Sequence, residues 1–465
     1  MSCAPTEDQV VEAARPYIER TEPLGLAKLL TTLQAEHQWT LSEKRLKKIL
    51  IASGLRDGPR KPWIPVSSLD DTVPMPPGVE PRYFDHVKGR GLVATKTYAE
   101  GQSIFVEDAY VAAPPPSQLS NMLQGQICTN CFLPTSGTSL SVACGAGSCG
   151  ARFCHRMCQS KAMAHHHALL CPGTNPGAKA LLTFMQQYQW HSIHTVARML
   201  ARTVLTGATV KPSSISPTTG ATVHGLPSHD APATWTETVH HLDSFATVSE
   251  LERRARNPGW ELERAGFLPA LQRAHVLMAD ALDPTRPSRP RRFPVPATAL
   301  PAKELERLFS WDMFLQLLGR ANINMESHGG MYLVHSHLNH DCTPNVSIRH
   351  MPGRNGVRPA TRITAQALRS IAPGDELAIS YVDPSLPVDR RRLLLWRDYC
   401  FGPCMCQRCV DESASSTESV PTDVDAEKAS KLARAPMPST TKSADTQDKP
   451  DPVSLEQELR TSLGF

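Results

Sequence analysis

Apolar residues recur at helical spacing near the start of the chain and predict a helical module over residues 1–58. Ser42 suits the first position of a helix, because its hydroxyl accepts a hydrogen bond from a free backbone N–H group. The helix that follows it would bury Leu46 and Leu50. We therefore expect helices within 7–20 and 25–51, and a proline-rich connector at 59–81.

Short apolar runs further along the chain predict strands, and longer runs with a 3.6-residue period predict helices. The strands are expected within 84–112 and at 332–334, 345–349, 361–364 and 377–381. The helices are expected at 181–204, near 247–282 and at 301–319, with a mobile Ser/Thr/Pro-rich loop near 208–235. The polar composition of 412–465 predicts a mostly disordered tail with a short helix at 453–463.

The composition is that of a globular protein, with 40% hydrophobic and 20% charged residues and a net charge of +4. No apolar run reaches the length of about 18 residues that a membrane span needs, so we expect no membrane partner. The first residues are polar and acidic, unlike a secretory signal. We therefore expect the protein inside the cell, where thiols stay reduced.

Cysteines gather in two stretches, which in a reduced compartment indicates metal binding. The first stretch joins seven cysteines to three consecutive histidines at 165–167. Seven thiolates and one imidazole would fill two tetrahedral zinc sites. The spacing to Cys171 favours His167 as the imidazole ligand, with His166 as the alternative. The candidate ligands are Cys128, Cys131, Cys144, Cys149, Cys154, Cys158, His167 and Cys171.

This order of six cysteines, a histidine and a cysteine resembles the MYND zinc finger. The resemblance implies a cross-braced pairing of the ligands. One zinc would be held by Cys128, Cys131, Cys154 and Cys158, and the other by Cys144, Cys149, His167 and Cys171. A RING-type ubiquitin ligase would place its histidine earlier, and a nucleic-acid-binding finger would interleave basic and aromatic residues that this block lacks.

Four segments contain most of the candidate catalytic and cofactor-binding residues of the chain. They are KGRGLVA at 88–94, SHLNHDCTPN at 336–345, GDELAISY at 374–381 and YCFGPCMCQRC at 399–409. In this order they resemble the SET-domain lysine methyltransferases. The finger between the two halves resembles the SET–MYND group, and within it the fungal histone methyltransferase branch.

The resemblance implies an α+β fold with a mainly-β SET core, whose strands surround a knot-like crossing. A zinc finger and a helical insertion would interrupt that core. After the helical module at 1–58, the expected segments are the first SET part at 82–127, the MYND-type finger at 128–171, the helical insertion at 172–320, the second SET part at 321–383, the post-SET zinc segment at 384–411 and the tail at 412–465.

The same resemblance implies methyl transfer from S-adenosylmethionine to a protein lysine. Only the neutral lysine amine, whose pKa is roughly 10.4 in water, attacks carbon, and the nearby sulfonium charge favours that neutral form. The protein must mainly align the reacting atoms and exclude water. By resemblance, Tyr381 is the catalytic tyrosine and Tyr399 walls the lysine channel. The cofactor-binding residues would be Arg90, Gly91, Asn324, Asn339, His340, Tyr381 and Phe401.

The second cysteine stretch resembles a post-SET zinc site, which ties the C-terminal flap to the cofactor loop. Its ligands would be Cys342, Cys404, Cys406 and Cys409. Three zinc ions would then use all but two of the 13 cysteines. Cys3 and Cys400 remain as ordinary thiols.

The resemblance implies a protein substrate, with histone tails or nucleosomes as the first choice and action in the nucleus, on the chromosome, or in the cytoplasm. A non-histone substrate such as a translation factor stays open. A silent adapter, whose finger binds a partner's peptide, is disfavoured because Asn339, His340 and Tyr381 are all present. Four basic residues near the N-terminus form either a solvated face or a docking surface for nucleic acid, namely Lys44, Arg45, Lys47 and Lys48.

Overall fold

The computed structural model of the protein describes residues 5–18, 25–52, 65–85, 88–137, 139–209, 234–257, 259–298, 300–350 and 362–417. Cys3, most of the predicted loop near 208–235 and the tail beyond 417 lie outside these residues. The chain divides into two compact units, Met1–Trp63 and Ile64–Phe465. Among the described helices, none is long and apolar enough to cross a membrane.

The first unit is built from three helices, α1 (Glu7–Ile18), α2 (Leu26–His37) and α3 (Glu43–Ala52). The hydroxyl of Ser42 accepts a hydrogen bond of 3.2 Å from the Arg45 N–H group, which satisfies one free donor at the start of α3. The three helices enclose one small apolar core. Its fully covered members include Val10, Ala14, Leu29, Leu33, Leu46 and Leu50.

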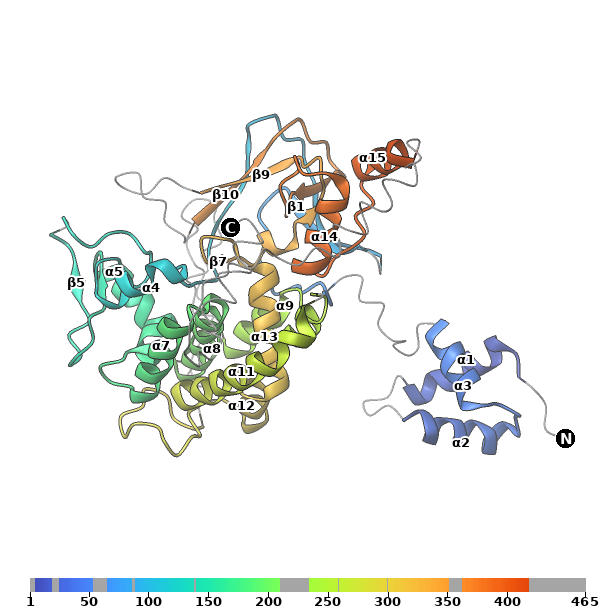
Figure 1. The fold of residues 1–465 in the computed structure, drawn as a ribbon, viewed down its shortest axis with the longest axis horizontal. Coiled ribbons are helices and arrows are strands. Elements are labelled where there is room, and N and C mark those ends of the chain that lie inside the picture. Colours follow the sequence, from blue (N-terminus) through green and yellow to red (C-terminus); the bar gives the residue numbers. More distant parts are fainter. Residues whose placement is uncertain are drawn as a thin grey trace, which may run out of the picture. The chain divides into compact units, whose positions relative to one another are not determined.

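The second unit contains a four-stranded sheet that joins distant parts of the sequence (Figure 1). Its strand order is β1 (Val79–Asp85), β2 (Gly89–Ala94), β11 (Glu376–Ile379) and β8 (Asn339–His340). The pairings are antiparallel except that of β11 with β8, which is parallel. The two ends of this unit's sequence thereby meet in one sheet.

A three-stranded antiparallel sheet has the order β3 (Ser103–Asp108), β10 (Arg362–Ala367) and β9 (Val346–His350). A two-stranded ribbon pairs β4 (Val111–Ala112) with β7 (Gly330–Met331). The strand predicted at 332–334 is wrong, because the chain turns there into a short 3-10 helix at His335–His337. The buried carboxylate of Glu107 holds this turn by accepting the N–H groups of Val334 at 2.8 Å and His335 at 2.9 Å.

The cysteine-rich segment follows helix α4 (Pro116–Leu123) and folds as a small module of its own. Its two-stranded ribbon pairs β5 (Val142–Ala143) with β6 (Arg152–Phe153). Helix α5 (Arg156–Ala162) then continues through a π-helical turn at Met163–His167 into α6 (Ala168–Leu170). The sequence predicts a short helix at this place, without the wider turn.

The helical insertion contains seven helices among the described residues. They are α7 (Pro176–Tyr188), α8 (His191–Thr209), α9 (Trp235–Ser244), α10 (Glu250–Arg254), α11 (Trp260–Leu282), α12 (Ala302–Leu308) and α13 (Trp311–Asn324). The single helix predicted at 181–204 is wrong, because Gln189 takes a left-handed conformation with φ of 50° and separates α7 from α8. Helix α9 was not predicted.

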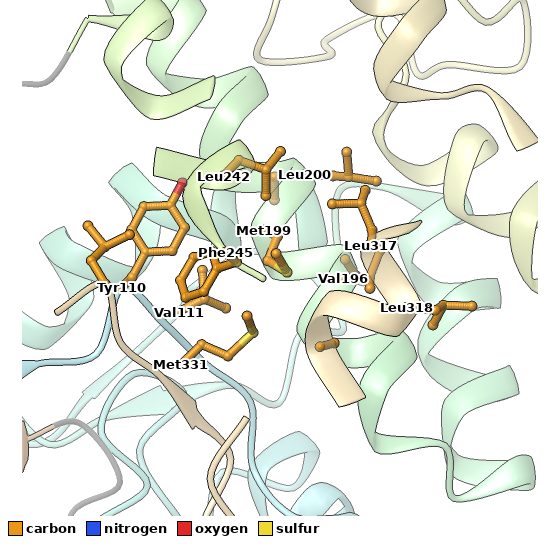
Figure 2. Packing of buried hydrophobic residues seen from close by; sticks show 14 of the residues in the cluster. Tyr110, Val111, Val196, Met199, Leu200, Leu242, Phe245, Leu317, Leu318 and Met331 are labelled. Carbon is orange, nitrogen blue, oxygen red and sulfur yellow. The ribbon is translucent and has the colours of Figure 1, made fainter. Parts of the chain in front are cut away.

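The insertion and the strands of this unit share one apolar core (Figure 2). Helix α8 lies at its centre and presents Val196 and Leu200, each exposed by no more than 1%. Tyr110 and Met331, beside the β4–β7 ribbon, pack in the same cluster. The helices therefore support the strands directly.

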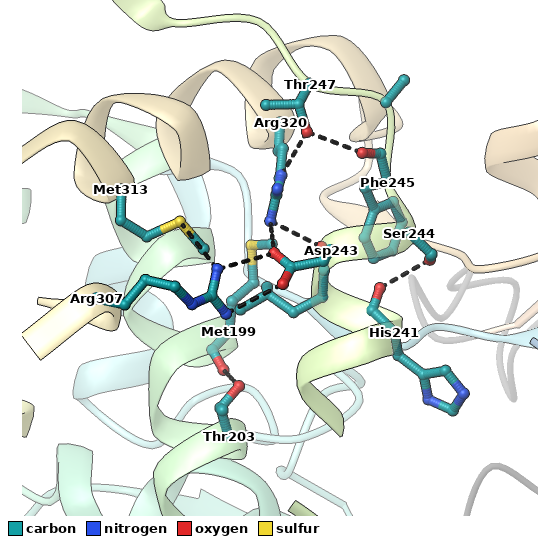
Figure 3. A network of polar contacts seen from close by, with 12 residues as sticks. Met199, Thr203, His241, Asp243, Ser244, Phe245, Thr247, Arg307, Met313 and Arg320 are labelled. Atoms are coloured by element: carbon teal, nitrogen blue, oxygen red, sulfur yellow. Dashed lines mark hydrogen bonds and ion pairs between the residues drawn. The ribbon is translucent and has the colours of Figure 1, made fainter. Parts of the chain in front are cut away.

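A polar network fixes the end of α9 (Figure 3). The Asp243 carboxylate accepts a hydrogen bond of 2.8 Å from Arg320 on α13 and pairs with Arg307 on α12 at 3.0 Å. The next carbonyl, that of Ser244, accepts a hydrogen bond from Arg90 on β2. The network thus connects the insertion to the four-stranded sheet.

Two helices complete the unit, α14 (Val388–Asp398) and α15 (Gln407–Thr417). The disordered tail predicted from residue 412 is therefore wrong over 412–417, where α15 continues. Glu412 anchors this part of α15 by accepting hydrogen bonds of 2.7 Å from both Arg391 and Arg408.

Candidate active site and cysteine clusters

The parallel pairing of β8 with β11 brings three predicted site residues together. Asn339 lies opposite Ala378 and His340 opposite Ile379, two residues before Tyr381. The Tyr381 N–H group donates a hydrogen bond of 3.0 Å to Nδ1 of His340. The ring centroids of His340 and Tyr381 lie 5.4 Å apart. Two motifs distant in sequence therefore form one surface.

Tyr381 and Tyr399 form an aromatic pair with ring centroids 4.9 Å apart and planes inclined by 31°. The Tyr381 hydroxyl donates a hydrogen bond of 2.6 Å to the Leu338 carbonyl oxygen. Burial raises the pKa of both tyrosines. Both hydroxyls are therefore protonated and uncharged at neutral pH.

The start of β2 packs tightly against Asn339. The Asn339 amide donates hydrogen bonds of 2.9 Å to the Arg90 carbonyl oxygen and of 2.9 Å to the Glu376 carboxylate. A Cβ atom on Gly91 would lie 2.6 Å from the Asn339 amide nitrogen and 2.7 Å from the Phe84 ring. Glycine is therefore required at 91 for this close approach.

Arg90 is a buried cation that points across the unit. Its guanidinium donates to the carbonyl oxygens of Ser68 and Ser244 and to the Ser336 hydroxyl. Burial lowers its pKa to about 10, although the neighbouring Tyr381 and Asp70 act in the opposite direction and raise it. The side chain remains charged at neutral pH.

The remaining two cofactor candidates also line the site. Phe401 meets His340 edge to face, with ring centroids 6.0 Å apart. The Asn324 amide donates to the carbonyl oxygens of Ala246 at 2.9 Å and Arg320 at 2.8 Å. Its NH₂ group is thus occupied within the protein.

The predicted catalytic and cofactor-binding residues, except Gly91, line one cavity of about 730 Å³, within the range of small-molecule sites. The cavity has polar lining that sequence analysis missed, including Glu326 and His335. These two side chains form an ion pair of 3.1 Å. Burial raises the pKa of Glu326, but the hydrogen bond and charge of His335 outweigh it and hold the pKa at about 2.

The finger brings four of its cysteines together beside the β5–β6 ribbon. Their sulfurs all lie within 4.8 Å of one another, and they belong to Cys128, Cys131, Cys154 and Cys158. Four thiolates at such distances suit tetrahedral Zn²⁺.

The second group of the finger includes His167 and not His166. Nε2 of His167 lies 3.2 Å from the Cys144 sulfur and 3.7 Å from the Cys149 sulfur. His166 instead lies 3.4 Å from the Arg198 guanidinium. Together with Cys171, these residues offer three sulfurs and one nitrogen within 4.8 Å of one another.

The third group joins the loop after β8 to the C-terminal flap. It gathers the sulfurs of Cys342, Cys404, Cys406 and Cys409. Nε2 of His340 lies 3.2 Å from the Cys342 sulfur. Among the described cysteines, only Cys400 stays outside the three groups. The third group therefore stands directly behind the cavity wall.

The comparisons of this chain with a family model and with known proteins agree with one another. The model of the SET domain matches residues 89–382. A protein of Mycosarcoma maydis described as histone-lysine N-methyltransferase SET5 is 39% identical over 99% of this chain and 100% of its own length. A protein of Yarrowia lipolytica with the same description is 27% identical over 90% of this chain and 85% of its own. A SET and MYND domain-containing protein of Dictyostelium discoideum is 36% identical over 22% of this chain and 18% of its own.

Proposed function

This chain belongs to the SET-domain family, and on that premise we propose that it is a protein-lysine methyltransferase that acts on histones with S-adenosylmethionine as methyl donor. The observation that carries the proposal is the junction of Asn339, His340 and Tyr381 at one cavity. The relative from Mycosarcoma maydis, which spans the whole chain, is described as a histone-lysine N-methyltransferase.

The adenosyl end of the methyl donor would bind near the β2–β8–β11 junction. His340 and Phe401 offer aromatic faces there, and Arg90, Gly91 and Asn339 offer polar and backbone contacts. Asn324 offers its amide oxygen, because its NH₂ group is already occupied. When bound, the donor supplies a methyl group on a positively charged sulfur, which leaves as a neutral thioether.

Tyr381 and Tyr399 would form the wall of the lysine channel. Their rings are fixed against each other and their hydroxyls carry no charge, so they orient an amine without trapping it as an ammonium ion. The Tyr381 hydroxyl donates its proton to the Leu338 carbonyl oxygen, so its own oxygen can act toward the lysine amine only as an acceptor. Alignment and exclusion of water are the main sources of rate for this reaction.

The three cysteine groups would each hold one zinc ion in a structural role. The two cysteine groups of the finger support our assignment to the SET–MYND group, and the exposed side chain of Met157 on α5 would offer a contact for a peptide partner. The group around Cys342 would close the cavity by tying the flap to β8. We assign the site of action to the nucleus or chromosome, in keeping with a histone substrate.

The test incubates the pure full-length protein with S-adenosylmethionine labelled on its methyl group. Core histones, nucleosomes and histone-depleted extract serve as separate substrates. Tyr381→Phe removes the proposed catalytic hydroxyl, and Tyr83→Phe, at a side chain that is 50% exposed, is the matched control.

Label on a histone that is lost only in Tyr381→Phe would support the whole proposal. Label confined to the depleted extract would retain the methyltransferase and overturn the histone substrate. Absence of label from every pool would overturn the enzyme and favour an adapter.

A further inference from the structure

A second kind of donor cluster lies beside the cavity, built from Glu326, His328 and His350. One ligand atom from each lies within 4.8 Å of the others. Glu326 and His328 belong to the turn between α13 and β7, and His350 ends β9. The turn is closed by hydrogen bonds from the Gly329 N–H group to the Glu326 carbonyl oxygen at 2.7 Å and from the Glu326 N–H group to the Gly330 carbonyl oxygen at 2.9 Å.

The two imidazoles approach unusually closely. Their ring centroids are 3.8 Å apart and their planes are inclined by 74°. Nε2 of His328 meets the Tyr332 hydroxyl at 2.8 Å. Its Nδ1 is buried and has no hydrogen-bond partner among the described residues. A buried ring nitrogen without a partner is costly, and coordination of a metal would remove that cost.

The contacts around these side chains also suit a metal. The Tyr332 hydroxyl holds Nε2 of His328, which leaves Nδ1 as the donor atom for an ion. Glu326 meets His335 through Oε1 at 3.1 Å, which orients the carboxylate and leaves its other oxygen for an ion. Such outer contacts, here from Tyr332 and His335, are usual around metal ligands.

We propose that Glu326, His328 and His350 form a site for one divalent transition-metal ion, separate from the three cysteine groups. Two imidazoles and a carboxylate leave coordination positions open, unlike a closed set of four thiolates. Nitrogen and oxygen donors suit zinc, cobalt, nickel or iron in the divalent state. Glu326 also lines the cavity, so the ion would stand at its wall. The proposal is independent of methyl transfer.

Cobalt(II) is the probe that separates this site from the cysteine groups. The full-length protein that carries three zinc ions, one for each cysteine group, is titrated with cobalt(II), and bound cobalt and zinc are counted after removal of free metal. We expect one cobalt per chain with no loss of zinc. Its near-ultraviolet absorption should lack the intense bands of thiolate-to-cobalt charge transfer, because no sulfur is a ligand.

Single variants assign the ligands. Glu326→Gln, His328→Gln and His350→Gln should each weaken cobalt binding by at least about tenfold. His240→Gln changes an exposed histidine in the same unit and should bind as the wild type does. Cobalt should also raise the melting temperature of the wild type and of His240→Gln but not of the ligand variants.

Three results would overturn the proposal. They are no cobalt bound by the wild type, equal binding by the wild type and all ligand variants, and charge-transfer bands that show exchange into a cysteine group. Zinc content and melting temperature without cobalt check that each variant is folded. Should His328→Gln unfold the protein, Glu326→Gln and His350→Gln still decide the question, since each tests a different donor.

Discussion

Nε of Arg391 donates a hydrogen bond of 3.2 Å to the sulfur of Cys342. The same guanidinium donates to the Cys409 sulfur at 3.3 Å and to the Glu412 carboxylate at 2.7 Å. Burial lowers the pKa of Arg391, but these hydrogen bonds outweigh burial and raise it. Four thiolates and one Zn²⁺ carry a net negative charge, so a buried cation beside them offsets that charge.

Arg391→Met should therefore release the zinc of the Cys342 group more easily. Removal of one member of a buried charge pair costs about 3 kcal/mol of stability. The measurement is the rate of zinc transfer to a chelator, together with unfolding in urea. Arg390→Met changes an exposed neighbour on the same helix and should leave both unchanged. Equal zinc release from the two variants would contradict this role for Arg391.

Loss of a zinc ligand should have a larger effect than loss of a cysteine outside the three groups. Cys342→Ser should lower the zinc content from three ions to two and abolish methyl transfer, because the flap is no longer tied to β8. Cys400→Ser, at a buried cysteine outside the groups, should keep three ions and most activity. Metal analysis of the purified proteins checks the counts, and activity without the Cys342 zinc would argue against flap closure.

Gly91→Ala should damage the site with little effect on the fold. The added methyl group meets Asn339 and Phe84, and a displacement of about 1 Å near reacting groups costs on the order of 100-fold in rate. Methyl transfer and donor binding by calorimetry would measure the loss. Gly266→Ala adds a methyl group on α11 with nothing within 4 Å, and should be neutral or stabilising by about 0.5 kcal/mol.

The buried carboxylate of Glu250 makes the free energy of unfolding depend on pH in the acid range. Its fully buried carboxylate accepts hydrogen bonds of 2.9 Å from Arg253, 2.8 Å from Arg254 and 2.8 Å from Asn322. Burial raises its pKa, but the two arginine charges outweigh burial and lower it to about 2. Since the folded pKa lies below the unfolded one, this stabilisation is present above about pH 4.5 and is lost as the pH falls toward 2.

Glu250→Gln should accordingly cost about 3 kcal/mol of unfolding free energy at pH 7. The difference between variant and wild type should shrink below about pH 4.5. Urea unfolding of both proteins across this range is the measurement, and acid loss of zinc affects both alike. A difference that stays constant down to pH 3 would show that charge is not its source.

Local patterns in the sequence predicted the cysteine groups well. All twelve predicted ligands assemble in three groups of four as the resemblance implies, and His167 joins its group in preference to His166. The choice is explained by the turn at Met163–His167, which places His167 toward Cys144. The pairing of the ligands came from the resemblance, and the spacing to Cys171 gave the choice of histidine.

Features that depend on distant partners were not predicted. The turn at Val334 requires Glu107, and the sulfurs of Cys342 and Cys409 require Arg391, neither of which belongs to a motif. Helix α9 was missed although Thr234 and Glu237 form a capping box at its start, a signal that is legible in the sequence. Glu326 and His335 were not predicted as site residues, because only the folded structure shows that they line the cavity.

The order of strands in the four-stranded sheet has a consequence for synthesis on the ribosome. Strand β2 emerges early, whereas its partner β11 and the flap at Cys404 emerge only after the finger and the helices. Long-range pairing of this kind is slow, and domains tend to fold as they emerge. A nascent chain that stalls before Glu376 would present folded zinc modules and an unpaired β2 edge, a form for chaperones to shield and proteases to remove. Binding of the methyl donor would then report that translation has passed Cys409.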